Sequence, residues 1–402
     1  MFFLSLFLLI VNKKKTIIKS IIVIMSIYFI WVLYSISFLN INQVLYQIKL
    51  DMFNILFVFN TITVLLISKN RKLYIKKIIK IILIFAIVNS IFVIFQGIFS
   101  KFYVTKILRI QWGAWSRKYG ISVISSNGKF RAIGLMNSYV SVSELFVIAT
   151  ILINEIKDTI KVSNKIKNTL LILFVISIYF TTYKTAYLWV VFYFGLKCLS
   201  FILLKLNNKY IKKVYDKTRM NYYNGNLLIS TSILLLLQWI LTNTFIFYKI
   251  IEKLSPKIAY NSIYLRVEFH NNIVNKMSTI TQKIMGLGMG LNGSYNGKMN
   301  LNGIKPIPLD SSYVYTLSNY GFLGLAIYIS FIAIIMVLSI FYDEYDKFGI
   351  KYLMSYLLCI QLFFNNLSTS IPISYIVIIL ILIFIFDIKN EINVKRLVFY
   401  KK

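Results

Sequence analysis

The stretch from residue 371 to residue 386, IPISYIVIILILIFIF, contains no charged residue and would be apolar on every face of a helix. Residues 227–241 form a second stretch of this kind. A strand of a membrane barrel would alternate polar and apolar residues over about ten positions, whereas these stretches do not alternate. They therefore predict helices that cross a membrane, which takes about 20 residues per crossing.

The composition of the whole chain agrees with this interpretation. Of the 402 residues, 58% are hydrophobic and the mean hydropathy is +0.73, whereas soluble domains contain about 45–50% apolar residues. We expect an all-α polytopic membrane protein with a single membrane domain over residues 1–402. About ten spans are predicted, at residues 17–39, 51–68, 78–98, 134–153, 168–183, 185–204, 227–247, 312–340, 352–367 and 370–386. Residues 1–11 are apolar but half as long as a span, so an eleventh span there is an open alternative.

Basic residues give the chain a net charge of +32, and their positions predict its topology. Loops and tails of one parity carry 27 Lys and Arg residues, whereas the short loops of the other parity carry two, Lys49 and Lys184. By the positive-inside rule the first set, which includes both termini, is cytoplasmic. The long segments 99–133 and 248–311 then lie outside, the larger one before the last three spans. This distribution predicts orientation in the cell membrane rather than binding of nucleic acid.

The sequence predicts neither a metal site nor a cofactor. Cys198 and Cys359 fall inside predicted spans, and His270 is the single histidine. The stretch GLGMGLNG at 286–293 superficially matches a dinucleotide fingerprint, but it follows a predicted helix and no βαβ unit surrounds it. We interpret its glycines as allowing the backbone to approach a helix or a ligand closely.

Three basic residues, Arg131, Lys184 and Arg266, are predicted at the outer ends of spans. Guanidinium groups bind phosphate oxygens through paired, charge-assisted hydrogen bonds, so these residues are candidates for a polyanion site. The alternative for each is contact with lipid headgroups. Glu144 lies in the middle of the predicted span 134–153, where a lone charge costs roughly 2.5–3.5 kcal/mol. It either orients Arg131 or Lys184, or it is a neutral or helix-bonded carboxyl group.

The stretch SIYLRVEFHNNIVNKM at 262–277 predicts an amphipathic helix in the larger outer segment. Its apolar stripe comprises Ile263, Val267, Val274 and Met277, with His270 on the same face. Arg266 and His270 are one turn apart and can reach one ligand. The alternative for His270 is a packed residue on an apolar face.

Three stretches carry a resemblance to a known family. FRAIGLMNS at 130–138 has an Arg-x-x-Gly sequence before a span, and TTYKTAYL at 181–188 forms a predicted outer turn. A third run passes from Arg266 through GLGMG at 286–290 to LDSSYVYTLSNYGFLGL at 309–325. In this order the stretches resemble the O-antigen and capsule polymerase (Wzy) family, which is related to the O-antigen ligases. The resemblance covers about residues 130–326, with Lys184 where the family has Arg.

The resemblance implies a metal-independent glycosyltransferase acting at the outer face of the membrane. It would move the growing chain from undecaprenyl pyrophosphate to the terminal sugar of a new lipid-linked repeat unit. Expected partners are these lipid-linked glycans and membrane lipid, with a chain-length regulator and a flippase in the same pathway. A ligase using another acceptor and a lipid-linked oligosaccharide flippase are the competing functions.

The acceptor hydroxyl must lose a proton, which requires a base. Asp310 is the favoured base, with His270 and Glu268 as the other candidates. For Asp310 the alternative is an N-cap of the span that follows.

Overall fold

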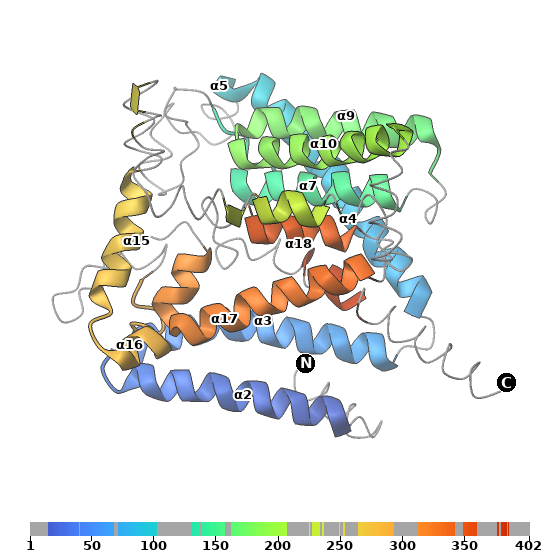
Figure 1. The fold of residues 1–402 in the computed structure, drawn as a ribbon. Helices are drawn as coiled ribbons and strands as arrows, with labels where there is room; N and C mark the ends of the chain where they lie inside the picture. The colour runs from blue at the N-terminus through green and yellow to red at the C-terminus, as the bar shows by residue number, and fades with distance from the viewer. Residues whose placement is uncertain are drawn as a thin grey trace. The chain divides into compact units, whose positions relative to one another are not determined.

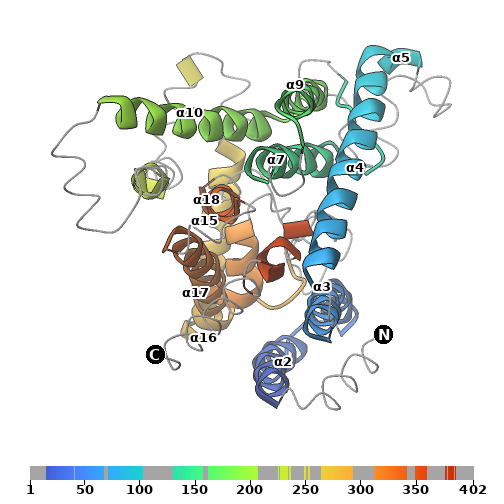
Figure 2. The same cartoon turned by 90° about the vertical axis from the view of Figure 1, so that its right-hand side faces the viewer.

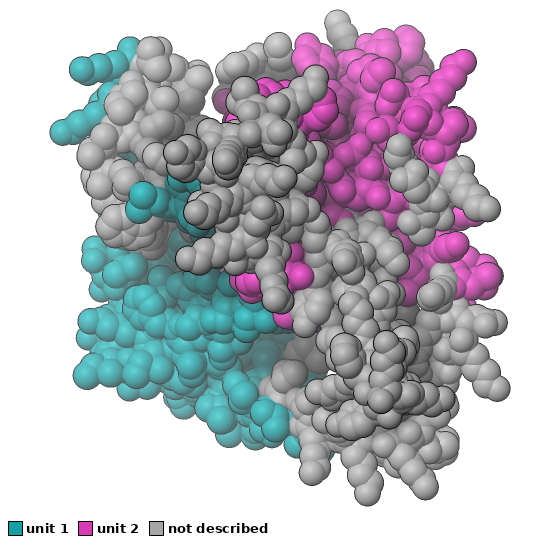
Figure 3. Space-filling view, turned by 45° about the vertical axis from the view of Figure 1, so that its right-hand side comes forward, with its two compact units in different colours: residues 1–69, 229–336, 354–379 teal, residues 70–228, 337–353, 380–402 magenta. Residues whose placement is uncertain are grey.

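The computed structural model describes residues 15–39, 41–67, 71–102, 130–136, 138–156, 162–206, 264–292, 312–341 and 349–359, with short pieces within 225–253 and 376–385. In these residues the regular elements are helices, as the all-α prediction requires. The chain divides into two compact units (Figure 3). The first comprises residues 1–69, 229–336 and 354–379, and the second comprises 70–228, 337–353 and 380–402.

The first unit is built on a hairpin of two long helices, α2 (Lys15–Ile36) and α3 (Ile41–Ile67), which run side by side (Figure 1). The bent helix α17 (Ser312–Phe341) packs beside them. Two shorter helices, α15 (Leu265–Lys276) and α16 (Ile280–Met285), lie at the end where α2 joins α3. Helix α15 runs across the direction of the hairpin (Figure 1).

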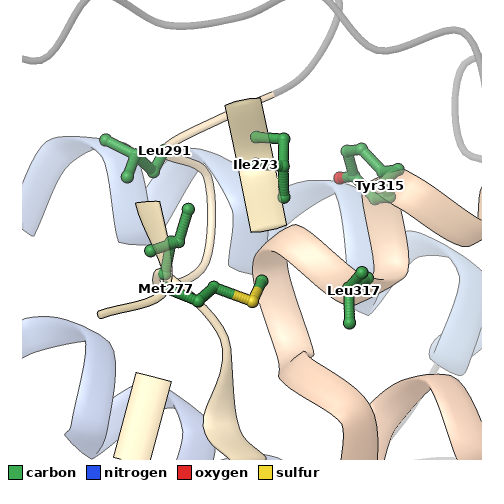
Figure 4. Close-up of a cluster of buried hydrophobic side chains, with 6 residues drawn as sticks. Ile273, Met277, Leu291, Tyr315 and Leu317 are labelled. Carbon is green, nitrogen blue, oxygen red and sulfur yellow. The ribbon is translucent and has the colours of Figure 1, made fainter. Parts of the chain in front are cut away.

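Apolar packing holds α15 and the chain after α16 against this hairpin end. One buried cluster comprises Ile273, Met277, Leu287, Leu291, Tyr315 and Leu317 (Figure 4). A second comprises Trp31, Val32, Val44 and Met289. Because both clusters include residues of the segment 286–292, this segment is part of the core of the unit.

The second unit is a helix bundle centred on α7 (Tyr139–Glu155). Helix α9 (Asn164–Thr181) runs beside α7, and α4 (Arg71–Ile98) crosses both (Figures 1 and 2). Helix α10 (Lys184–Leu206) packs on α7 and α9, and the three-residue α5 (Ser100–Phe102) follows α4. Every residue from Ser141 to Ile153 is buried. Helix α18 (Ile350–Cys359) begins in this unit and ends in the first.

Helices are observed at eight predicted spans, where α2, α3, α4, α7, α9, α10, α17 and α18 lie. Their starts differ from the predicted residues in several cases, including α4, which begins at Arg71 rather than at residue 78. For α3 and α7 the structure shows the cause. Helix α3 begins at Ile41 rather than at residue 51, because its first turns are amphipathic and bury Gln43 and Gln47 on a polar face. Helix α7 begins at Tyr139 rather than at residue 134, because side chains of α4 hold the preceding backbone in another conformation.

Within the described part of the chain, two helices are long and apolar enough to cross a bilayer, Leu73–Ile98 in the second unit and Tyr313–Phe341. Helix α4 also exposes many large apolar side chains, namely Ile81, Ile84, Phe85, Ile91, Phe92, Phe95 and Ile98. Water-soluble proteins rarely leave an apolar surface of this extent uncovered, whereas lipid covers it readily. Residues 1–14 and most of the segments 99–133, 207–263 and 360–402 lie outside the described residues.

Candidate functional site

Arg131 lies in a short extended segment that is held by hydrogen bonds on two sides. The N–H group of Ala132 donates to the carbonyl oxygen of Phe180 in α9, at 3.1 Å. On the other side, the buried Oε1 of Gln96 in α4 accepts from the N–H groups of Ile133 and Gly134, at 3.0 and 2.9 Å. Both contacts use backbone groups next to Arg131, so α4 and α9 together fix the point from which its side chain extends.

Gly134 gives a structural reason for the Arg-x-x-Gly spacing. Its φ is +57°, in the left-handed region that glycine adopts without strain. A Cβ atom at this position would also lie 2.8 Å from Oδ1 of Asn89 and 2.9 Å from Cγ2 of Val142. The same Asn89 oxygen accepts the N–H group of Leu135 at 3.0 Å. Any side chain at residue 134 would therefore disturb the segment that carries Arg131.

The guanidinium group of Arg131 rests on an aromatic ring. Its Cζ lies 4.5 Å from the centroid of Tyr139, the first residue of α7. The ring of Tyr139 in turn meets that of Tyr183 edge to face, with centroids 6.0 Å apart. Lys184 follows Tyr183 directly, begins α10 and is exposed. Arg131 is thus linked through the Tyr139–Tyr183 pair to the backbone position that precedes Lys184, although Arg131 and Lys184 are 53 residues apart in sequence.

The turn before Lys184 is also fixed. Helix α9 ends at Thr181, and the capping residue Thr182 has a φ of +53°, which is unusual for a residue other than glycine. Ser143 of α7 donates a hydrogen bond of 2.6 Å to Oγ1 of Thr181. A threonine with left-handed backbone is strained, so the contacts around it must hold the backbone in this conformation. Strained residues of this kind often occur at functional sites.

Glu144 follows Ser143 and is fully buried in α7. It belongs to the same unit as Arg131 and Lys184. Its role of orienting either cation stays a prediction. At the far end of α7, Glu155 makes a separate network: it accepts from Tyr193 and pairs with Lys197, each at 2.5 Å. Because α7 has 17 residues, its ends are about 25 Å apart at 1.5 Å per residue, so this network is remote from Arg131.

The remaining candidates belong to the first unit. Arg266, Glu268 and His270 lie on α15 as predicted, with Glu268 partly buried. The side chains of Arg266 and His270, and Asp310 as a whole, lie outside the described residues. The predicted apolar stripe of this helix is wrong at Val274, which is 41% exposed, because α15 turns Ile273 into the core instead.

Two glycines of the 286–293 stretch, Gly286 and Gly290, approach other backbone closely, as the sequence predicted. Gly286, Gly288 and Gly290 all have positive φ. A Cβ atom at Gly286 would lie 2.7 Å from the backbone nitrogen of Gly321, and one at Gly290 would lie 2.8 Å from the carbonyl oxygen of Gln43. Gly321 interrupts α17 with φ 69° and ψ −169°. Residues 286–292, here called the glycine turn, therefore fit against the break in α17 and the start of α3.

A buried polar cluster in the first unit was not predicted. Asp51 of α3 accepts hydrogen bonds from Tyr28 at 2.9 Å, from Tyr320 at 2.5 Å and from Gln47 at 2.8 Å. Tyr315 donates to the other end of the Gln47 amide at 2.8 Å. The available signal was the spacing of Gln43, Gln47 and Asp51, four residues apart, which places them on one helix face.

Among the described residues, no group of three or more His, Cys, Asp or Glu side chains could hold a metal ion. Comparison of this chain with models of protein families, with curated proteins and with solved structures found no match.

Proposed function

We propose that this protein is a polysaccharide polymerase of the cell membrane, which joins repeat units carried on undecaprenyl pyrophosphate. The observation that carries the proposal is the group around Arg131, where a guanidinium is held on Tyr139 beside the Tyr183–Lys184 turn. A guanidinium held in one position suits a pyrophosphate group, because it compensates the charge that develops as the bond from pyrophosphate to sugar breaks.

The membrane body is proposed to have about ten spans, with both termini in the cytoplasm and the segments 99–133 and 248–311 outside. Support comes from the helices that coincide with predicted spans, from the apolar surface of α4 and from the distribution of Lys and Arg. In this topology the start of α7 and the turn before α10 are both at the outer face. That is the side on which lipid-linked repeat units are polymerised in the family that the sequence resembles.

In the proposed reaction, an acceptor hydroxyl attacks the anomeric carbon of the growing chain. The bond from that carbon to the pyrophosphate oxygen breaks, and undecaprenyl pyrophosphate leaves with the electron pair. Arg131 and Lys184 stabilise the leaving group, and a base takes the hydroxyl proton. Glu144 orients one of these cations. The roles of Arg266, Glu268, His270 and Asp310 stay predictions from the sequence, with Asp310 as the favoured base. No metal or cofactor is assigned to this reaction.

The test uses Arg131→Lys in cells that make the polymer. Lysine keeps the positive charge but cannot form the paired hydrogen bonds of a guanidinium. Losing one preorganised contact of this kind lowers a rate roughly a hundred- to a thousand-fold. Cells should therefore accumulate single lipid-linked repeat units, measured by gel electrophoresis of extracted glycans at matched protein level. The control is Lys165→Ala, which removes an exposed cation from the opposite end of α9. Full-length polymer in Arg131→Lys cells would refute the assignment.

A transporter of lipid-linked glycans is the second candidate, favoured by the break in α17 at Gly321. Transporters commonly bind substrate where a membrane helix is interrupted. The two functions differ in where repeat units collect when the gene is deleted. Loss of a polymerase leaves them on the outer leaflet, and loss of a transporter leaves them on the inner one. Periodate oxidation and an impermeant hydrazide label, applied to cells stripped of their wall, distinguish these outcomes.

A further inference from the structure

Helix α3 presents a polar stripe to the glycine turn and to α17. Gln43, Gln47 and Asp51 follow one another at intervals of four residues, so they share a helix face. Gln43 and Gln47 are both buried. Gln43 is the third residue of α3, at the hairpin end beside the glycine turn, and Asp51 is about 12 Å further along the helix at 1.5 Å per residue.

The side chains of Gln47 and Asp51 have hydrogen-bond partners within the protein. The Gln47 amide donates to Asp51 and accepts from Tyr315, so both of its ends are bonded. Asp51 accepts two further hydrogen bonds from tyrosines. These groups tie α2, α3 and α17 together, which is a structural role.

The Gln43 side chain, at the start of α3, differs from Gln47 and Asp51. Gln43 is fully buried, yet neither its Oε1 nor its Nε2 has a hydrogen-bond partner within the part of the chain that the structure describes. Asn319 directs its amide elsewhere: its Oδ1 accepts from the N–H group of Gly290 and its Nδ2 donates to the carbonyl oxygen of Tyr315. A buried amide without hydrogen-bond partners lowers the stability of the fold. Such a group therefore suggests that a bound molecule supplies the missing hydrogen bonds.

The chemistry of an amide restricts which ligand groups can form these hydrogen bonds. The Gln43 amide offers a donor group, its NH2, and an acceptor group, its carbonyl oxygen, side by side. A hydroxyl group matches both, because it donates one hydrogen bond and accepts others, whereas a phosphate without its proton only accepts and an ammonium group only donates. The glycine turn brings backbone rather than side chain to this position, since a Cβ atom at Gly290 would lie 2.8 Å from the Gln43 carbonyl oxygen and 3.4 Å from Cβ of Gln47.

We infer that Gln43 binds a hydroxyl group of a glycan at the outer end of the α2–α3 hairpin. The identity of the ligand as a glycan rests on the proposed function. Gln43 then acts in substrate binding, separately from the cations around Arg131. The competing occupant is a buried water molecule, which offers the same donor and acceptor.

The experiment compares Gln43→Met with Gln47→Met, two replacements of a buried glutamine by an apolar side chain of similar length. The probe is the lipid-linked glycan extracted from cells that lack the gene, titrated against purified full-length protein by native mass spectrometry. For Gln43→Met we expect binding about tenfold weaker, as the loss of two hydrogen bonds implies, with an unchanged or higher melting temperature. Gln47→Met should melt lower, because Asp51 and Tyr315 each lose a partner.

Each outcome decides a separate point. Equal glycan binding by the wild type and Gln43→Met overturns the inference, and if Gln43→Met then also melts lower, the occupant is water. If the wild-type protein binds no lipid-linked glycan, both the inference and the proposed function fail. If it binds the glycan through Gln43 but forms no polymer in a purified assay, the polymerase proposal fails and the binding site stands.

Discussion

Replacing Gly321 by alanine tests how tightly the glycine turn and α17 fit together. In the native structure a Cβ atom at this residue would lie 2.1 Å from the carbonyl oxygen of Ile284 and 2.5 Å from the backbone nitrogen of Gly286. Neither atom is free to move. The N–H group of Gly286 makes the last hydrogen bond of α16, to the carbonyl oxygen of Gln282 at 2.8 Å. Relief of the clash would therefore unwind α16 or displace α17.

Two costs add in this variant. Backbone with φ 69° and ψ −169° is essentially restricted to glycine, and another residue there is strained by about 1–3 kcal/mol. Overpacking of a filled site adds about 1–3 kcal/mol. We expect Gly321→Ala to lower the free energy of unfolding by about 2–6 kcal/mol, a range that reaches beyond ordinary single substitutions.

The assay is thermal unfolding of the purified protein in detergent, followed by the loss of the monodisperse peak in size-exclusion chromatography. Gly195→Ala is the matched control, because a Cβ atom at this position in α10 would meet nothing within 4 Å. Alanine favours a helix over glycine by about 1 kcal/mol, so the control should melt at or above the wild-type temperature. A Gly321→Ala protein that melts with the wild type would refute the interlocked arrangement.

Two further predictions concern the buried carboxyl group and the topology. Asp51→Asn should lower the free energy of unfolding by about 1–3 kcal/mol in the same melting assay. The reason is that one of the two acceptor oxygens of Asp51 becomes a donor that faces Gln47 or the tyrosines. An unchanged melting temperature would mean that the cluster contributes little to stability. With both native cysteines replaced, a cysteine at Ser116 should react with an impermeant thiol reagent in intact cells, and one at Ser163 should not. Labelling at Ser163 would invert the predicted topology and exclude an outer-face polymerase with it.

The helices were predictable where the chain is uniformly apolar. Helix α4 and α17 follow directly from their composition, because an apolar run of this length has few alternatives to a helix in lipid. Helix starts were less predictable. At α3 a polar face extends the helix ten residues beyond the apolar run, and at α7 the side chains of Asn89 and Gln96 from another helix delay the start. Such side chain to backbone contacts depend on tertiary structure, which the local sequence does not contain.

The candidate site divides in the same way. The close approach of the glycines was predictable, because three glycines within five residues have a limited range of uses. The contact of Arg131 with the ring of Tyr139 could not be predicted, because a cation and a ring eight residues apart have no fixed spatial relation outside a helix. Asp51 was missed because its tyrosine partners are 23 and 269 residues away in sequence.

The contact between Gly286 and Gly321 also bears on how this protein can change over evolutionary time. Where two ordinary side chains meet, enlargement of one can be compensated by reduction of the other. Here neither residue has a side chain to reduce, and a Cβ atom on either would lie within 2.7 Å of the other's backbone nitrogen. The two glycines are therefore expected to persist together or disappear together. A pair of glycines 35 residues apart, the first after a capped short helix and the second inside an apolar one, is thus a signature for finding distant relatives whose overall sequence has diverged.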